Sequence, residues 1–219
     1  MVKDISKYID YTLLKADAAE ASFEKLCREA QKHGFYSVCV PPYAVSKCRN
    51  LMGEGGKIAT VIGFPLGYAS RESKVFETGR ALEDGADEID AVINISAFKS
   101  GGTDYVLDEL KEIRKASAEY VLKIIIETCY MNDEEIIALC GLVSKSGADF
   151  IKTSTGFGPG GAHIKDIELI KSNIPARVKI KASGGIKTFE QAESFIKAGA
   201  SRIGTSSMLI KQTASGRDV

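Results

Sequence analysis

Short apolar runs, rich in β-branched residues, alternate along the chain with longer segments in which apolar residues recur every three or four positions. The runs start 20 to 33 residues apart, the length of a strand, a helix and two loops. We predict strands at residues 37–40, 57–64, 88–94, 121–128, 150–156, 178–185 and 202–207. We predict helices at residues 22–33, 70–84, 104–118, 133–146 and 188–198. The pattern therefore predicts seven strand–helix units.

The ends of several helical segments carry capping residues. Asn132 and Thr188 stand where a helix N-cap is expected. A glycine in the left-handed conformation commonly ends a helix. Glycines follow four of the segments, at Gly34, Gly85, Gly147 and Gly199.

Near-continuous apolar strands separated by helices predict a parallel sheet covered by those helices. Residues 8–12 are the one remaining strand candidate, and an eighth strand lets the sheet close into a barrel. We therefore predict that residues 1–219 form one α/β domain, a (β/α)8 TIM barrel. The alternative is a doubly wound open sheet, which is disfavoured because no G-x-G-x-x-G follows the first strand.

Charged residues occupy one face of four successive predicted strands. Side chains alternate along a strand, so residues two apart share a face. The aliphatic face then packs on the helices, and the charged face lines the lumen of the barrel. The charged set is Glu88, Asp90, Lys123, Glu127, Lys152, Lys179 and Lys181.

Two interpretations of this charged lumen compete. The residues are either structural ion pairs or parts of a reactive site. Buried ion pairs are usually no more stabilising than an apolar core of the same volume, which favours function. A lysine beside another ammonium group has a lowered pKa, and its free amine can attack a carbonyl to form a Schiff base. A carboxylate such as Asp90 can then carry protons, directly or through water.

Composition excludes several other classes. The 29 basic and 29 acidic residues cancel, so we expect neither nucleic acid nor a membrane surface as a partner. Five cysteines without a C-x-x-C pair, and two histidines far apart in sequence, predict no metal site and a reduced environment. The first residues have no apolar signal core, and no run reaches transmembrane length. We expect a soluble cytoplasmic protein without a cofactor.

Five motifs resemble those of the deoxyribose-phosphate aldolase family, and the resemblance extends from about Ile9 to Met208. It implies a TIM barrel and a class I aldolase that cleaves 2-deoxy-D-ribose 5-phosphate into D-glyceraldehyde 3-phosphate and acetaldehyde. The motifs are Ile62-Gly-Phe-Pro-Leu-Gly67, Asp87-Glu-Ile-Asp-Ala-Val-Ile-Asn94, Lys123-Ile-Ile-Ile-Glu-Thr128, Phe150-Ile-Lys-Thr-Ser-Thr-Gly-Phe157 and Lys179-Ile-Lys-Ala-Ser-Gly-Gly-Ile186.

The resemblance also implies residue roles. Lys152 forms the Schiff base, Lys181 lowers the pKa of Lys152 and takes part in proton transfer, and Asp90 carries protons with water. Asp10 and Thr12 approach the substrate or the lysine pair. Homodimers or homotetramers are expected of such barrels.

The phosphate is expected on the loops after the last two strands, as in many TIM barrels. These loops are residues 183–186 and 204–207, and residues 156–161 are placed at the rim of the site. The predicted substrate-binding residues are Asp10, Thr12, Thr155, Gly184, Gly185, Ser206 and Ser207.

The chain departs from the family pattern at two points. Some members have a lysine after Ser-Thr-Gly, where this chain has Phe157. Some members end in a tyrosine that helps proton transfer, whereas this chain has no tyrosine after Tyr130. Two further functions stay open on the residues alone: another lysine-dependent lyase, of the keto-acid aldolase or transaldolase type, and a non-catalytic barrel that binds a sugar phosphate.

Overall fold

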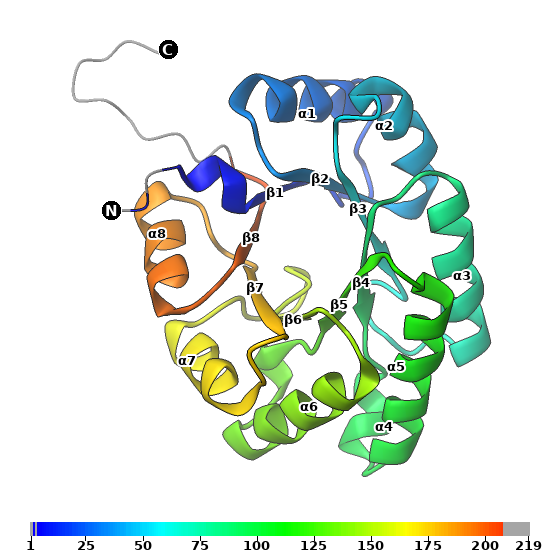
Figure 1. The fold of residues 1–219 in the computed structure, drawn as a ribbon, viewed down its shortest axis with the longest axis vertical. Helices are drawn as coiled ribbons and strands as arrows, with labels where there is room; N and C mark the ends of the chain where they lie inside the picture. Colours follow the sequence, from blue (N-terminus) through cyan, green and yellow to red (C-terminus); the bar gives the residue numbers. More distant parts are fainter. Residues whose placement is uncertain (1, 3, 208–219) are drawn as a thin grey trace.

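The computed structural model describes residue 2 and residues 4–207, and its centre is a closed barrel of eight parallel strands in sequential order (Figure 1). Pairing of the first strand with the last closes the sheet. This confirms the TIM barrel and excludes the open sheet. The strands are β1 (Ile9–Thr12), β2 (Ser37–Val40), β3 (Ile58–Ile62), β4 (Glu88–Val92), β5 (Val121–Ile125), β6 (Phe150–Lys152), β7 (Lys179–Ser183) and β8 (Arg202–Thr205).

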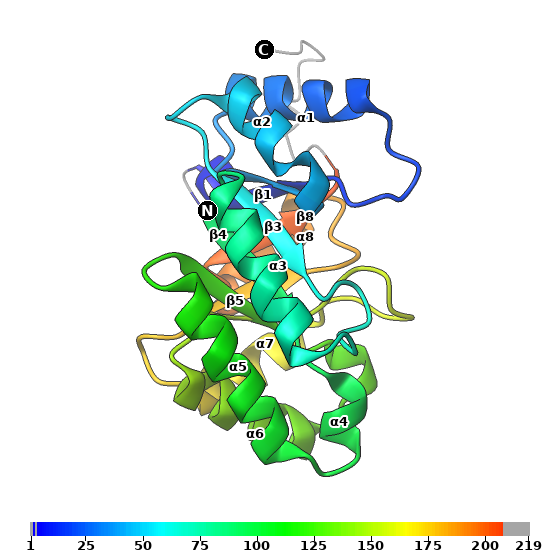
Figure 2. The same cartoon turned by 90° about the vertical axis from the view of Figure 1, so that its right-hand side faces the viewer.

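Helices surround the barrel, and neighbouring helices such as α3 and α5 run side by side (Figure 2). No bounds were predicted for α2, α4 or α7, which fill connections after β2, β4 and β6. The helices are α1 (Glu20–His33), α2 (Val45–Met52), α3 (Arg71–Glu83), α4 (Ile95–Lys99), α5 (Thr103–Ser117), α6 (Asp133–Ser146), α7 (Ile164–Asn173) and α8 (Phe189–Ala198).

The predicted N-caps and two of the four predicted glycines end helices as expected, whereas Gly199 ends α8 outside the αL conformation, with φ of 130°, and Gly85 follows the C-cap Asp84 of α3. Asn132 and Thr188 each form a capping box, in which the side chain accepts from the third residue of the helix and receives a reciprocal bond. Gly34 and Gly147 adopt the left-handed conformation, with φ of 61° and 84°. These local signals fix where α6 and α8 begin and where α1 and α6 end.

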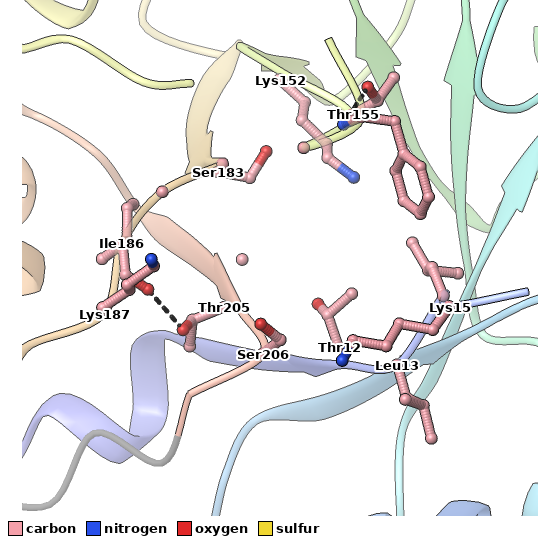
Figure 3. Close-up of a pocket in the computed structure, with 16 residues that line it drawn as sticks. Thr12, Leu13, Lys15, Lys152, Thr155, Ser183, Ile186, Lys187, Thr205 and Ser206 are labelled. Carbon is pink, nitrogen blue, oxygen red and sulfur yellow. Dashed lines mark hydrogen bonds between the residues drawn. The ribbon is translucent and has the colours of Figure 1, made fainter. Parts of the chain in front are cut away.

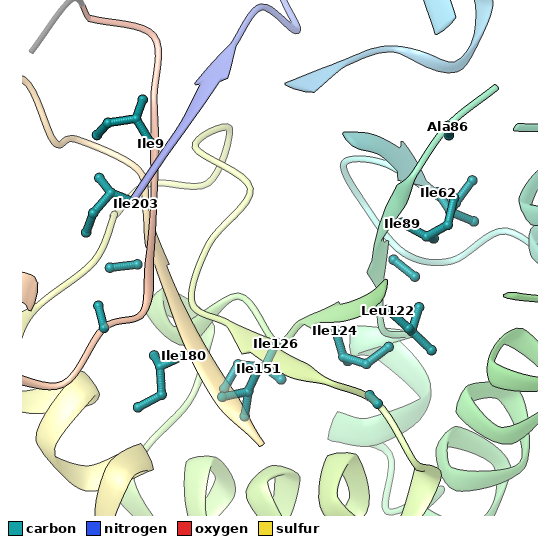
Figure 4. Close-up of a cluster of buried hydrophobic side chains, with 14 of the residues drawn as sticks. Ile9, Ile62, Ala86, Ile89, Leu122, Ile124, Ile126, Ile151, Ile180 and Ile203 are labelled. Atoms are coloured by element: carbon teal, nitrogen blue, oxygen red, sulfur yellow. The ribbon is translucent and has the colours of Figure 1, made fainter. Parts of the chain in front are cut away.

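The outer face of the barrel is aliphatic, as strand parity predicted. Ile89, Ile124, Ile151 and Ile180 point away from the lumen and belong to the main hydrophobic core between strands and helices (Figure 4). Burial of such side chains stabilises the fold by roughly 1.5–3 kcal/mol each. The opposite parity is thereby left to face the lumen.

Several strands end earlier than predicted. The predicted strand 150–156 stops at Lys152, and the predicted strand 121–128 stops at Ile125. The remaining residues of these runs are loops at the carboxyl end of the barrel.

Within the described part of the chain, none of the helices has the length and apolar character that a membrane span requires. Met208 and the rest of the predicted domain up to residue 219 lie outside the described residues.

Candidate active site

Strand register brings the two motif lysines together. Lys152 of β6 and Lys181 of β7 are paired in register, as are Asp90 of β4 and Lys123 of β5. Because these residues have the same parity, all four side chains enter the lumen. Lys181 is fully buried, and Lys152 is 3% exposed.

Asp90 joins the two lysines directly. Its Oδ2 atom lies 2.8 Å from Lys152 Nζ and 2.7 Å from Lys181 Nζ. Lys181 Nζ also donates to Asp10 Oδ2, from β1. The three candidate catalytic residues, predicted to share one face of the barrel, are therefore in contact, and Asp10 contacts Lys181, one of the alternatives that the family resemblance implied.

A second set of contacts lies below this group, toward the amino ends of the strands. Lys123 Nζ lies 2.6 Å from Asp90 Oδ1 and 2.6 Å from Glu88 Oε2. Arg202 Nη1 lies 3.0 Å from Glu88 Oε2 and 2.8 Å from Asp10 Oδ1. The Arg202 guanidinium also packs on the Tyr36 ring, 3.4 Å from its centroid.

These contacts form a closed loop, which we call the ionic ring: Lys181, Asp10, Arg202, Glu88, Lys123 and Asp90. The ring contains three cations and three carboxylates, so its charges balance. Lys152 attaches to it through Asp90 alone. Lys152 is thus the surplus cation of this cluster, the one whose loss of a proton leaves no carboxylate of the ionic ring without a cation.

Burial and charge set the protonation of these groups. Burial lowers the pKa of Lys152, and the nearby Lys181 ammonium lowers it further against the opposing effect of Asp90. Burial disfavours the charged form of Lys181, but Asp10 and Asp90 outweigh it and raise its pKa. Lys123, Lys152 and Lys181 together overcome burial and hold the pKa of Asp90 well below its usual range. The neutral amine is therefore most accessible at Lys152.

Lys152 points into a pocket of about 330 Å³ at the carboxyl end of the barrel (Figure 3). This volume is within the range of small-molecule sites. The lining residues are Thr12, Leu13, Leu14, Lys15, Lys152, Thr155, Gly156, Phe157, Ser183, Gly184, Gly185, Ile186, Lys187, Gly204, Thr205 and Ser206.

Most predicted substrate-binding residues line this pocket. They are Thr12, Thr155, Gly184, Gly185 and Ser206. Asp10 and Ser207 are not among the lining residues. Asp10 lies beneath the pocket in the ionic ring, and the Ser207 N–H donates to Thr205 Oγ1 at 3.0 Å.

Two of the seven charged residues predicted to line the lumen lie outside the cluster of Lys152 and the ionic ring. Lys179 has the predicted parity but is exposed at the start of β7, where its Nζ lies over the Phe150 ring. Glu127 is buried but joins no ion pair of the ionic ring, because it lies beyond the end of β5 and contacts Thr155 instead. Parity alone did not tell how far along the barrel each charge lies.

The lysines at the rim of the pocket were not predicted from the sequence. Lys15 and Lys187 line the pocket on opposite sides in the view of Figure 3. Lys15 follows the β1 motif by three residues, and Lys187 directly follows the glycine turn after β7. Proximity to these motifs was the available signal. Phe157 also lines the pocket, at the position where some aldolases have a lysine.

The glycine turn after β7 is held against the loop after β6. The Ala162 N–H donates to the Gly184 carbonyl at 3.1 Å. A Cβ atom on Gly161 would lie 2.2 Å from the Gly184 oxygen, so only glycine fits there. This contact fixes the turn that lines one side of the pocket.

Among the described residues, no group of three or more His, Cys, Asp or Glu side chains is arranged to hold a metal ion.

Comparison with known proteins agrees with this geometry. The model of the DeoC/LacD family aldolases matches residues 5–217. The chain belongs to this aldolase family. It is 52% identical over 209 residues to the deoxyribose-phosphate aldolase of Thermococcus gammatolerans, with 93% of each chain covered.

Solved aldolase structures have the same fold. The aldolase QR15 superposes with a TM-score of 0.91 at 47% identity, covering 94% of this chain and 93% of that one. The tetrameric deoxyribose phosphate aldolase of Aeropyrum pernix gives a TM-score of 0.87 at 36% identity, covering 93% and 87%.

Proposed function

We propose that the chain reversibly cleaves 2-deoxy-D-ribose 5-phosphate into acetaldehyde and D-glyceraldehyde 3-phosphate through a Schiff base on Lys152. The observation that carries the proposal is the charge balance of the lumen: Lys152 is the surplus cation and the one that reaches the pocket. Relatives at about half identity named deoxyribose-phosphate aldolase support the choice of substrate.

The first step is attack of the neutral Lys152 amine on the C1 carbonyl of the open-chain sugar. Asp90 Oδ2 accepts one N–H of Lys152, which holds the amine at the edge of the pocket. The carbinolamine gains a proton on its hydroxyl and loses water, which leaves an iminium ion. Lys181 stays protonated beside it, so its charge keeps the amine free before attack.

The iminium ion then accepts the electrons of the breaking C2–C3 bond. The C3 hydroxyl loses its proton as glyceraldehyde 3-phosphate leaves, and the two remaining carbons form an enamine on Lys152. Protonation of the enamine at C2 and addition of water release acetaldehyde and regenerate the amine. We assign these proton transfers to Asp90 and water, since Asp90 is the carboxylate in direct contact with Lys152.

The phosphate end of the substrate fits the rim. Gly184 and Gly185 have φ of 87° and 78°, and backbone N–H groups of turns with such left-handed residues can bind anions. Ser206 supplies a hydroxyl, and Lys15 and Lys187 supply the positive charge that Phe157 lacks. We propose that these groups bind the phosphate. The tetramer of the Aeropyrum pernix enzyme supports a homo-oligomer here as well.

Reductive trapping tests this function. Borohydride reduces the acetaldehyde iminium to an ethyl group on the lysine nitrogen, and peptide mass spectrometry should find that group on Lys152. Cleavage of 2-deoxy-D-ribose 5-phosphate should continue in a chelator. Absence of an ethyl group on Lys152 after borohydride treatment would contradict the assignment of Lys152 as the Schiff-base lysine. Preference for a keto-acid donor would indicate the other lyase type, and binding of the sugar phosphate without cleavage would indicate the non-catalytic barrel.

A further inference from the structure

Glu127 is a buried carboxylate that the proposed reaction does not use. It is 1% exposed, and within the described part of the chain it forms no ion pair with a lysine or arginine. Both of its oxygens accept from the Thr155 N–H, at 3.1 and 3.2 Å, and its Oε2 also accepts from the Thr155 hydroxyl. A buried carboxylate is costly, so its contacts with one pocket residue call for an explanation.

The backbone of Glu127 is strained at the point where it passes Lys152. Its φ of 52° and ψ of 68° lie in the left-handed region, which costs a non-glycine residue roughly 1–3 kcal/mol. On either side, the Ile126 N–H donates to the Lys152 carbonyl at 3.0 Å, and the Thr128 N–H donates to the Thr153 carbonyl at 2.9 Å. The strained residue is therefore clamped to the strand that carries Lys152, with its side chain directed at Thr155.

The loop after Thr155 rests on this carboxylate. The Thr155 hydroxyl oxygen accepts the Phe157 N–H at 3.0 Å, which is the dashed line beside Thr155 in Figure 3. The Phe157 ring packs edge-on against Phe64, with ring centroids 5.2 Å apart. A Cβ atom on Gly158 would lie 3.4 Å from Glu127 Cδ, so the loop backbone closely approaches the carboxylate.

We propose that Glu127 is a positioning residue: through Thr155 it holds Phe157 and the loop 155–158 as the pocket wall beside Lys152. The inference rests on the proposed function and adds a residue outside the pocket to it. The wall faces the part of the substrate beyond the reacting carbonyl. Loss of the Glu127–Thr155 contact therefore weakens binding of the five-carbon phosphate and spares reaction of a two-carbon aldehyde with Lys152.

The test separates these two steps in Glu127→Ala. We expect the KM for 2-deoxy-D-ribose 5-phosphate to rise at least about tenfold, while the rate of borohydride trapping with saturating acetaldehyde stays within about twofold of wild type. Glu127→Gln keeps an acceptor oxygen for Thr155 and should restore the KM to within about threefold. A merely structural role would lower the unfolding temperature without this split between KM and trapping.

A Thr155 variant keeps the proposal testable if Glu127→Ala does not fold. Thr155→Val removes the hydroxyl that joins Glu127 to the Phe157 N–H, and it should reproduce the rise in KM while acetaldehyde trapping stays within about twofold of wild type. An unchanged KM in Glu127→Ala or Thr155→Val overturns the proposal, as does a Glu127→Gln variant as impaired as Glu127→Ala. Wild-type protein that traps no acetaldehyde would instead overturn the proposed function, and this inference with it.

Discussion

Two buried lysines, Lys74 and Lys152, each contact a carboxylate, and their surroundings differ in ways that matter for chemistry. Outside the barrel, Lys74 of α3 is fully buried, with its Nζ 2.9 Å from Glu109 Oε1 and 2.8 Å from the Val92 carbonyl. In the lumen, Lys152 lies 2.8 Å from Asp90. Burial is the largest cause lowering the pKa of both lysines. Burial and a lowered pKa therefore do not by themselves mark a nucleophile.

Charge balance and access distinguish the two lysines. Lys74 has one carboxylate of its own and does not line the pocket, and its stem lies under Gly63, where a Cβ atom would be 2.7 Å from Lys74 Cε. Lys152 shares its carboxylate with two other lysines and opens onto the pocket. A lysine that shares its carboxylate with other cations and opens onto a cavity is suited to react. A lysine that has its own carboxylate and is packed away from any cavity is suited to stabilise the fold.

The largest expected effect is on activity. Lys152→Ala should lower kcat/KM for 2-deoxy-D-ribose 5-phosphate by a factor on the order of 10⁴ or more, because it removes the nucleophile. Its stability should be unchanged or higher, since a surplus buried cation is gone. Lys179→Ala, which removes an exposed lysine of β7 outside the ionic ring, is the matched control and should keep its activity. Residual Lys152→Ala activity within about tenfold of wild type would contradict the comparison.

The next effect is on stability. Lys74→Ala should lower the free energy of unfolding by about 3–5 kcal/mol, because it leaves Glu109 buried without its partner. Acetaldehyde trapping on Lys152 should persist. The double variant Lys74→Met with Glu109→Leu should recover most of the loss, since an apolar pair of similar volume replaces the ions. Denaturant titrations measure both. Loss of trapping without loss of stability would reverse the roles of the two lysines.

The smallest effect is a shift in pH dependence. Lys181→Leu removes the ammonium beside Lys152 and leaves Asp90 less compensated, so the pKa of Lys152 rises. The amine is then free only at higher pH, and the midpoint of the trapping rate should move up. At neutral pH the rate falls about tenfold for each unit of that shift. Lys181→Arg keeps the charge and should keep the midpoint. A profile in Lys181→Leu that matches wild type would remove the electrostatic role.

Much of the fold and the lysine pair was predictable because strand alternation is a local rule. Apolar runs gave the strands, and parity placed Lys152, Lys181 and Asp90 in one lumen before any contact was known. The register of the strands then places these side chains close enough for Asp90 to contact both lysines. The ionic ring itself was not predicted, since Arg202 and Asp10 come from opposite ends of the sequence and meet only when β8 pairs with β1.

The rim of the pocket was less predictable because loops follow no such period. Lys15 and Lys187 reach the pocket from loops whose paths depend on tertiary packing. Glu127 lies outside the ionic ring because its backbone adopts the left-handed conformation just after β5. No pattern of residue types in the sequence predicts that conformation for a non-glycine residue.

The lowered pKa of Lys152 also makes the stability of the fold depend on pH. The unfolded chain holds a proton on Lys152 up to a pKa of about 10.4, whereas the folded pKa is lower. Between those two values the unfolded state binds the extra proton, so folding releases it and stability rises with pH by up to about 1.4 kcal/mol per unit. Lys74, whose pKa is also lowered, adds to the same slope. Within that window a rise in pH therefore favours the free amine and, through Lys152 and Lys74, the folded state.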